Sequence, residues 1–416
     1  MTSVISTPPV SDASVGTQTR TALLLFEPPD GGVTENVLQL ALRIRSARWS
    51  VVVAGPELSN IRARLEEEGI EYVVLEHLRR GYGRPPQDMA ALREIKRVLR
   101  GRRFDVVHTH ASKAGFLGRL AASQVGIPAI YSPHCFGFVG DVSTKRRLFA
   151  LGLERWLGRH TDGLLCVSDA ERRLAIQHKI VPPDVIRHIR HGVDCGPDEA
   201  NEELLAFRGD GLLVGAVTVL REQKRLDVLI DAIPAVLEAM PKARFAIVGN
   251  GPTGDELRAQ ADRMGLIERG AVKFFDFAPP STQWLRALDV YVLPSAWEAM
   301  PIGALEALAC GVPQVVSRVD GADEIVTPQT GTLVAPKDVG GLAAALIGLL
   351  ADDGRRLAAA RASRRRADDV FPVDDMVAST VDFYEACIER LQPDAPAPSA
   401  PRRSGRFSRA TRTTSF

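Results

Sequence analysis

Residues 293–313 read LPSAWEAMPIGALEALACGVP, the end of an apolar strand followed by a short loop and a helix. Pro301 suits the first position of that helix, because its missing N–H has no intrahelical partner there in any case. The free backbone N–H groups and the dipole of such a helix start form a site for phosphate. Glu306 is the only charged residue of the predicted helix Pro301–Cys310, so we expect its carboxylate to be buried and to need donors. Ligand hydroxyls, a neighbouring Arg or backbone N–H groups would supply them.

The rest of the chain repeats this strand and helix pattern. Short β-rich apolar runs alternate with amphipathic helical stretches, which is typical of parallel sheets covered by helices. We predict an α/β fold with two doubly wound parallel-sheet, Rossmann-like domains, in which ligands bind outside the carboxyl ends of the strands. The predicted strands are Ala22–Phe26, Val51–Ala54, Tyr72–Leu75, Phe104–His108, Ala129–Ser132, Gly163–Val167, Leu212–Val219, Arg244–Val248, Val272–Phe275, Val290–Leu293, Gln314–Val316 and Thr332–Val334.

Length and composition agree with two ordinary cores. The chain has 416 residues, 45% hydrophobic and 25% charged, which excludes a wholly disordered, collagen-like or coiled-coil protein. It contains neither an apolar run of membrane-spanning length nor a signal segment, so we expect a cytoplasmic protein. The five cysteines are scattered, and none forms a Cys-x-x-Cys pair, so the sequence predicts neither a disulfide frame nor a zinc site.

Charge is distributed unevenly along the chain. Residues 1–195 hold 27 basic and 20 acidic side chains, residues 196–391 hold 20 and 30, and residues 392–416 hold 5 and 1. The basic excess of the first half predicts either attraction to an anionic membrane surface or a solvated face. The segment Thr144–Arg159 also allows two interpretations. It is either an amphipathic helix at a membrane interface or a helix that faces the protein core. The basic cluster comprises Arg79, Arg80, Arg84, Arg93, Lys96, Arg97, Arg100, Arg102, Arg103, Lys145, Arg146 and Arg147.

The spacing of two acidic residues points to a family. Glu298 and Glu306, separated by seven residues in this sequence context, resemble the Glu-x7-Glu motif of the family 4 glycosyltransferases, retaining enzymes with the GT-B fold. The resemblance extends over residues 22–391. The segments HTHASKAGFLGRLAA (108–122) and YSPHCFGF (131–138) look like a branch of the family that builds bacterial surface polysaccharides.

The resemblance implies a domain plan with two Rossmann-like domains facing each other across a cleft. An acceptor-binding domain covers residues 21–195, a linker 196–210 and a nucleotide-sugar-binding domain 211–372. A helix over 373–391 is expected to pack back towards the first domain. Residues 1–20 and the basic tail 392–416 are expected to be disordered.

The resemblance also implies a donor site. Its catalytic residues would be His134, Glu298 and Lys224, with His134 contacting the transferred sugar. Val219 occupies the arginine position of the family's Arg-x4-Lys diphosphate clamp, and Arg221, two residues later, is the alternative cation. Backbone or side-chain contacts with the donor would come from Gly31, Gly32, Arg221, Lys224, Gly249, Gly251, Glu298, Ala299, Met300, Pro301, Ile302, Gly303 and Glu306.

The implied reaction is transfer of a hexosyl unit from a UDP- or GDP-sugar to a sugar or lipid-linked acceptor in surface polysaccharide or glycolipid synthesis. The family needs no cofactor and no metal, and we expect no nucleic-acid partner. His108 and His110 share one face of a strand without further residues of ligand spacing, which does not favour a metal site. The alternatives are a nucleotide-sugar 2-epimerase and a non-catalytic nucleotide-binding scaffold of a polysaccharide-assembly complex. An anionic membrane surface is a further expected partner, with the protein peripheral on the inner face of the cell membrane.

Overall fold

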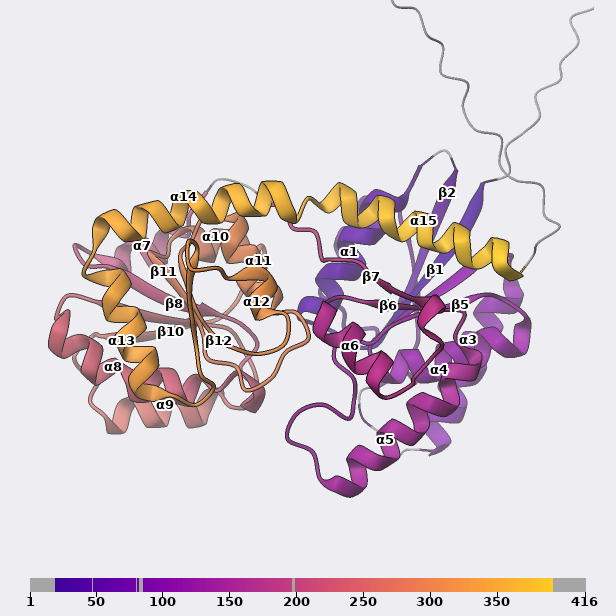
Figure 1. The fold of residues 1–416 in the computed structure, drawn as a ribbon, viewed down its shortest axis with the longest axis horizontal. Coiled ribbons are helices and arrows are strands. Elements are labelled where there is room, and N and C mark those ends of the chain that lie inside the picture. The colour runs from indigo at the N-terminus through magenta and orange to yellow at the C-terminus, as the bar shows by residue number, and fades with distance from the viewer. Residues whose placement is uncertain (1–18, 47, 80, 82–84, 197–198, 392–416) are drawn as a thin grey trace, which may run out of the picture.

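The computed structural model describes residues 19–46, 48–79, 81, 85–196 and 199–391. Two α/β domains lie side by side, and the last two helices run along both (Figure 1). The segments predicted to be disordered lie outside the described residues, except at positions 19 and 20. Arg80 and Arg84 of the basic cluster also lie outside the described residues. The prediction is wrong at Arg20, which begins the first strand and donates its backbone N–H to the carbonyl of Arg48.

The N-terminal domain contains a seven-stranded sheet of order β3-β2-β1-β4-β5-β6-β7, and every strand pair is parallel. The strands are β1 Arg20–Phe26, β2 Trp49–Gly55, β3 Glu71–Val74, β4 Val106–His110, β5 Ala129–Ser132, β6 Gly163–Cys166 and β7 Ile186–His188.

Strand β4 is displaced from its predicted position, and one strand of the sheet was not predicted at all. Strand β4 runs to His110 rather than from Phe104 to His108, because its pairing with β1 continues to Phe26↔His110 and both histidines are buried. The three-residue edge strand β7 was not predicted, because its sequence Ile-Arg-His carries no apolar run.

Helices cover both faces of this sheet. Apolar side chains of α3 and α4 pack on one face, and those of α1 pack on the other together with the C-terminal helix α15. The helices are α1 Gly32–Ile44, α2 Arg62–Glu67, α3 Pro85–Gly101, α4 Ser112–Val125, α5 Thr144–Leu157 and α6 Asp169–Gln177, with short 3-10 turns η1 Gly158–His160 and η2 Pro183–Val185.

The C-terminal domain contains a six-stranded parallel sheet of order β10-β9-β8-β11-β12-β13. The strands are β8 Leu213–Val217, β9 Arg244–Val248, β10 Val272–Phe275, β11 Val290–Leu293, β12 Gln314–Ser317 and β13 Gly331–Val334. The helices are α7 Glu202–Arg208, η3 Glu222–Lys224, α8 Leu226–Ala239, α9 Gly254–Arg263, α10 Ser281–Arg286, α11 Ile302–Ala309, α12 Ala322–Ile325 and α13 Val339–Leu350. Helix α7 lies within residues 196–210, the predicted linker.

The chain returns to the first domain at its end. Helix α14 (Asp353–Val370) packs against α11 in the C-terminal domain, whereas α15 (Val373–Leu391) packs against α1 in the N-terminal domain (Figure 1). Tyr384 of α15 is fully buried beside Trp49 of β2, with 5.6 Å between their ring centroids. Within the described residues, no helix combines the length and the apolar character needed to cross a membrane.

Candidate active site

Two helix starts meet between the domains. Gly31 precedes α1 with a φ of 90°, in the left-handed region that glycine adopts readily. A Cβ atom at Gly32 would lie 2.7 Å from Cγ1 of Ile302, the first residue of α11. The glycine pair therefore brings the backbone of the N-terminal domain into direct contact with the start of α11.

Helix α11 begins one residue later than expected. Pro301 is its N-cap rather than its first helical residue, and no side chain caps the helix start. The first backbone N–H groups of a helix have no intrahelical acceptor, so those at Ile302 and Gly303 are oriented to bind an anion.

The loop before α11 holds a partly buried ion pair. Glu298 is 7% exposed, and its Oε1 lies 2.6 Å from Nζ of Lys224, which ends η3 after strand β8. Ser295 donates its hydroxyl to the same oxygen at 2.8 Å. The Gln223 amide donates to the Trp297 carbonyl at 2.7 Å and to Oε2 of Glu298 at 3.3 Å. The structure thus brings together two of the three predicted catalytic residues, Lys224 and Glu298.

A second cation lies across the domain boundary. Arg221, after β8, donates from Nη2 to Oδ1 of Asp30 at 2.7 Å, and Asp30 directly precedes the glycine pair. Val219 is half-buried on the same segment. Arg221 therefore reaches the glycine loop from the position two residues beyond Val219.

Glu306 lies in the second turn of α11. The Ser281 hydroxyl of α10 donates to its Oε1 at 2.8 Å, so a serine supplies one of the donors that the sequence called for. Burial raises the pKa of Glu306 to about 8, and the nearby carboxylate of Glu35 in α1 acts in the same direction. A ligand that donates hydroxyl hydrogen bonds here would favour the ionised form.

The glycine turn after β9 packs on the end of β8. A Cβ atom at Gly249 would lie 1.9 Å from the Thr218 carbonyl oxygen, and one at Gly251 would lie 2.3 Å from that of Leu220. Glycine is therefore required for this backbone packing, and the turn lies beside the segment that carries Arg221.

Ala299 and Met300 have buried side chains, at 7% and 5% exposure. Any contact that these two predicted donor-binding positions make with a ligand would come from their backbone.

His134 lies in the loop after β5 with an unusual backbone. It has a φ of 51° and Cys135 a φ of 100°, two consecutive non-glycine residues with positive φ. Such conformations persist only where the surroundings impose them. Here the buried Glu171 accepts the backbone N–H of Cys135 at 2.8 Å and that of Val167 at 3.0 Å. Burial raises the pKa of Glu171 to about 7.

Three further histidines surround His134. Nδ1 of His110 lies 3.0 Å from Nε2 of His134, the rings of His110 and His108 are 3.9 Å apart, and the ring of His191 stacks on His134 at 5.6 Å. The sequence placed His108 and His110 on one face of a strand, but it gave no role to His191. His191 lies in the segment Arg190-His-Gly-Val-Asp194. Under the family resemblance this segment is similar to a Pro-Asn-Gly-Val/Ile-Asp motif and differs from it at two positions, one of them His191, and this departure was the available signal.

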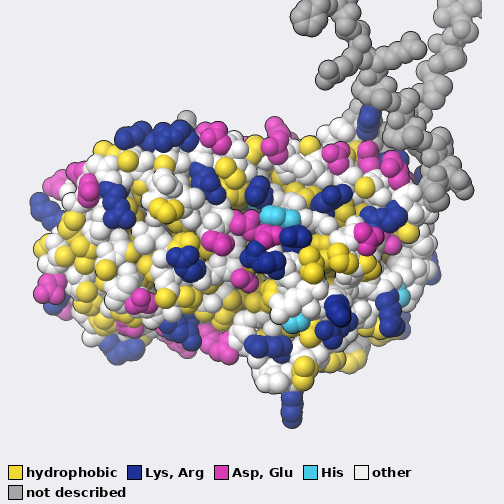
Figure 2. All heavy atoms as spheres, viewed as in Figure 1, with side chains coloured by type: hydrophobic (Ala, Val, Ile, Leu, Met, Phe, Trp, Pro, Cys, Tyr) yellow, Lys and Arg dark blue, Asp and Glu magenta, His cyan; other side chains and the backbone are white. Residues whose placement is uncertain are grey.

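The domains also touch elsewhere around the cleft. A Cβ atom at Gly140 would lie 2.7 Å from the Trp297 indole, and Glu324 of α12 accepts the backbone N–H of Asp169 at 2.7 Å. Figure 2 shows acidic, basic and histidine side chains gathered between the domains on this face. The two domains are therefore in contact at Gly140 and Trp297 and at Asp169 and Glu324, in addition to the contact between Gly32 and Ile302.

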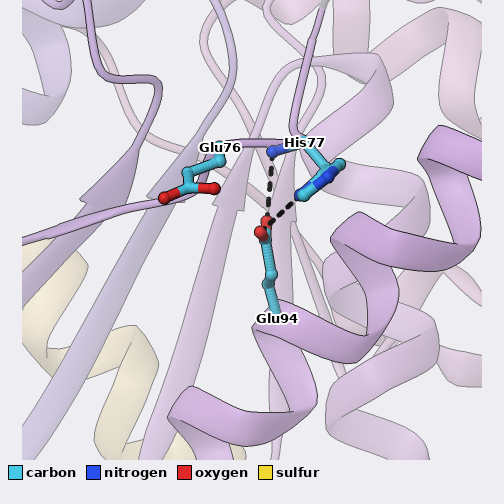
Figure 3. Close-up of side chains that lie close together, drawn as sticks. All are labelled: Glu76, His77 and Glu94. Atoms are coloured by element: carbon cyan, nitrogen blue, oxygen red, sulfur yellow. Dashed lines mark hydrogen bonds and ion pairs between the residues drawn. The ribbon is translucent and has the colours of Figure 1, made fainter.

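One group of side chains in the described residues has metal-ligand chemistry. Glu76 and His77 follow β3, and Glu94 lies on α3 (Figure 3). Glu94 accepts from the His77 backbone at 3.2 Å and is hydrogen-bonded to its Nδ1 at 2.6 Å. The Glu94 carboxylate thus supplies hydrogen-bond partners for the backbone N–H and the Nδ1 atom of His77. The group contains none of the residues predicted for the donor site.

The sequence matches two family models. Residues 31–192 match a glycosyl transferase 4-like domain, and residues 210–352 match the glycosyl transferases group 1. The chain is 31% identical over 274 residues to the UDP-Gal:alpha-D-GlcNAc-diphosphoundecaprenol alpha-1,3-galactosyltransferase of Escherichia coli, covering 63% of this chain and 70% of that protein. It is also 31% identical over 315 residues to D-inositol 3-phosphate glycosyltransferase 2 of Catenulispora acidiphila, covering 70% and 72%.

Solved structures show the same fold. Anabaena HepE in complex with UDP and glucose superposes with a TM-score of 0.76 at 22% identity, covering 88% of this chain and all of that one. WaaG, a glycosyltransferase involved in lipopolysaccharide biosynthesis, superposes with a TM-score of 0.66 at 19% identity, covering 89% and 99%. With the paired sheets, the Lys224–Glu298 pair and the two matched models, the chain belongs to the family 4 glycosyltransferases and has their GT-B fold.

Proposed function

We propose that the protein is a retaining, metal-independent hexosyltransferase that uses a UDP-sugar and acts on a sugar or lipid-linked sugar in surface polysaccharide or glycolipid synthesis. The observation that carries this proposal is the Lys224–Glu298 pair beside the uncapped start of α11, with the Gly31-Gly32 loop packed against it. The E. coli relative is named for UDP-Gal and a diphosphoundecaprenol acceptor, and HepE was solved with UDP, which favours UDP over GDP.

The donor diphosphate would lie at the start of α11. Backbone N–H groups at Ile302 and Gly303, the Lys224 ammonium and the Arg221 guanidinium would stabilise the negative charge that develops on the departing phosphate. In the structure Lys224 is bound to Glu298 and Arg221 to Asp30, so both cations have carboxylates that hold them in position beside this helix start.

The two acidic residues of the motif would hold the rest of the donor. Glu298 would accept hydrogen bonds from hydroxyls of the transferred sugar, and Glu306 from those of the ribose. In a front-face retaining mechanism the leaving phosphate takes the proton of the acceptor hydroxyl. No side chain then needs to act as covalent nucleophile, and we assign no general base.

The donor site uses cationic groups in place of a metal. Oε1 of Glu298 already accepts from Lys224 and Ser295, and the remaining charge stabilisation comes from Arg221 and backbone N–H groups. We therefore infer that neither a metal nor a cofactor takes part in transfer.

The central experiment measures nucleoside diphosphate release from UDP-sugars with and without candidate lipid-linked acceptors, in buffer and in EDTA. We expect UDP release that depends on acceptor and is unchanged by EDTA, with a product that keeps the donor's anomeric configuration by NMR. Conversion of the donor sugar without acceptor would instead support the 2-epimerase. UDP binding without turnover would support the scaffold.

A lipid-linked acceptor requires access to the membrane. Helix α5 is fixed to its domain through the buried Glu154, which accepts from Arg119 at 2.8 Å and from the Tyr131 hydroxyl at 3.0 Å. Its other side exposes 64% of Leu148 and 63% of Phe149, beside the basic residues 145–147. One face of α5 therefore packs on its domain, and the other presents exposed apolar side chains next to basic ones.

A second basic surface lies near α5. Helices α3 and α5 both contact α4, and α3 carries a shallow cavity of about 580 Å³ lined by Arg93, Lys96, Arg97, Arg100 and Gly101. We infer that α3 and α5 bind an anionic membrane, which would place the protein in the cytoplasm on the inner face of the cell membrane.

Vesicle sedimentation tests this placement. The protein should pellet with anionic vesicles and not with zwitterionic ones, and Leu148→Ser/Phe149→Ser should reduce the pelleted fraction severalfold because it removes the apolar contacts. Leu357→Ser, which changes a leucine of α14 that is 54% exposed, is the matched control and should pellet like the wild type. Equal pelleting with both vesicle types would contradict the assignment.

A further inference from the structure

The four histidines form one connected group, here called the histidine ladder: His108, His110, His134 and His191. His108 and His110 lie on β4, His134 follows β5, and His191 follows β7. At one end, His108 is hydrogen-bonded through Nδ1 to the Tyr384 hydroxyl at 2.7 Å and through Nε2 to Ser132 at 2.8 Å. At the other end, the Asn36 amide donates to Nδ1 of His191 at 2.8 Å. Both ends of the ladder thus lie close to the C-terminal helix α15, at one end through Tyr384 and at the other through Asn36, whose amide also contacts the sulfur of Met376 at 3.5 Å.

The ladder is neutral at physiological pH. Burial lowers the pKa of His108 to about 3 and that of His191 to about 4. Burial, together with the neighbouring histidines, also holds the pKa values of His110 and His134 well below the usual range. Each ring therefore carries one proton, and the position of that proton determines which ring nitrogen donates and which accepts.

The surroundings of His110 determine where its proton lies. Its Nδ1 faces Nε2 of His134 at 3.0 Å, whereas its Nε2 is buried and has no hydrogen-bond partner among the described residues. A buried N–H without an acceptor is rarer in proteins than an acceptor without a donor. The proton of His110 accordingly lies on Nδ1 and is donated to Nε2 of His134.

This hydrogen bond fixes the neighbouring ring. Because Nε2 of His134 accepts from His110, the one proton of His134 lies on Nδ1. Among the described residues the His134 ring is hydrogen-bonded through Nε2, so Nδ1 is the nitrogen left for a ligand. The nitrogen that remains for a ligand is therefore a donor.

We propose that His110 is a positioning residue that holds His134 as its Nδ1–H tautomer, so that His134 offers the sugar substrate a hydrogen-bond donor. The inference rests on the proposed function in one respect, that His134 faces the sugar. Close contact of the His110 ring with the His108 ring, at 3.9 Å between centroids, fixes the ring that donates, and the Glu171 contact with Cys135 fixes the backbone of the loop that carries His134. The preferred sugar would then present an oxygen that accepts this hydrogen bond.

The tautomer is measured directly by 15N NMR of the imidazole nitrogens in the full-length wild type, with His134 assigned by loss of its signals in His134→Gln. We expect a protonated Nδ1 and an unprotonated Nε2 for His134. In His110→Phe, which keeps a ring for stacking but has no donor, we expect the His134 protonation pattern to change or to average between tautomers. A protonated Nε2 on wild-type His134 would overturn the proposal whatever the activity.

Kinetics supply the second readout. His110→Phe should lower kcat by about tenfold to 100-fold, with KM for the UDP-sugar within about twofold, because the proposed contacts with the nucleotide come from the other domain. His110→Asn places an amide donor near the position of Nδ1 and should recover most of kcat. Thermal unfolding midpoints, with His77→Phe as a control histidine 44% exposed in its side chain, check that each variant is folded.

The outcomes separate the two proposals. Equal kcat values for folded His110→Phe and His110→Asn would overturn the positioning role. If His134 shows the Nδ1–H tautomer but His134→Gln transfers sugar at the wild-type rate, the tautomer assignment stands and the role of His134 in the proposed function fails.

Discussion

Lys224→Ala should reduce sugar transfer by about 100-fold to 1000-fold, the range found when one group stabilising a developing anion is removed. The ammonium lies 2.6 Å from Glu298 and beside the start of α11, where it would neutralise the departing phosphate. Its loss also leaves the carboxylate of Glu298, 7% exposed, without its cation. Initial rates of UDP release with saturating acceptor measure the effect.

The control for Lys224→Ala is Lys273→Ala. Lys273 pairs with Glu203 at 2.9 Å on the surface of the same domain, and exposed pairs contribute little, so this variant should transfer sugar at the wild-type rate. Glu298→Gln should lower transfer as well, because an amide cannot accept hydrogen bonds at both of its terminal atoms. Transfer by Lys224→Ala within about threefold of wild type would contradict the phosphate role of this lysine and leave Arg221 as the main cation.

Gly32→Ala should lower kcat/KM by about tenfold to 100-fold, which is the scale of a misplacement near 1 Å between reacting groups. The new methyl group would lie 2.7 Å from Cγ1 and 3.1 Å from Cβ of Ile302. Isoleucine is β-branched and held to one main rotamer in a helix, so the backbone of the glycine loop or of the start of α11 must shift to relieve the contact. Steady-state kinetics for donor and acceptor measure the change.

A second substitution tests this explanation. Ile302→Ala removes Cγ1, the atom at 2.7 Å, and leaves only the Cβ contact at 3.1 Å, so Gly32→Ala/Ile302→Ala should recover most of the lost kcat/KM. Gly101→Ala adds a methyl group at the end of α3, where nothing lies within 4 Å, and should leave kinetics unchanged. Failure of the double variant to recover, with its unfolding midpoint intact, would show that Gly32 acts through backbone freedom and not through this contact.

The strands of the second domain were the most predictable part of the fold. Arg244–Val248 and Val290–Leu293 have the bounds expected from sequence, because strands buried on both faces appear as continuous apolar runs. Strand β7 and the end of β4 could not be predicted in this way, because their paired residues include the polar side chains of His188 and His110. Burial of polar side chains there depends on partners from distant segments.

The site followed the same division. The Glu298 and Glu306 motif was visible in sequence because both residues lie on one strand, loop and helix. The contact of Arg221 with Asp30 joins residues in different domains, and the donor to Glu306 is a serine from another helix. No local pattern determines such pairings, since they depend on how the two domains meet.

The position of α15 has a consequence for synthesis of the chain. Phe383, Tyr384 and Cys387 are buried in the N-terminal domain, and a Cβ atom at Gly163 of β6 would lie 2.8 Å from the Cys387 sulfur. About 185 residues separate the end of β7 from the start of α15, so at roughly 5–20 residues per second the ribosome needs about 10 to 40 s to deliver this helix. Until then the N-terminal domain exposes the apolar surface that α15 covers. This domain is translated first, but its fold is completed only when the last helix has been made.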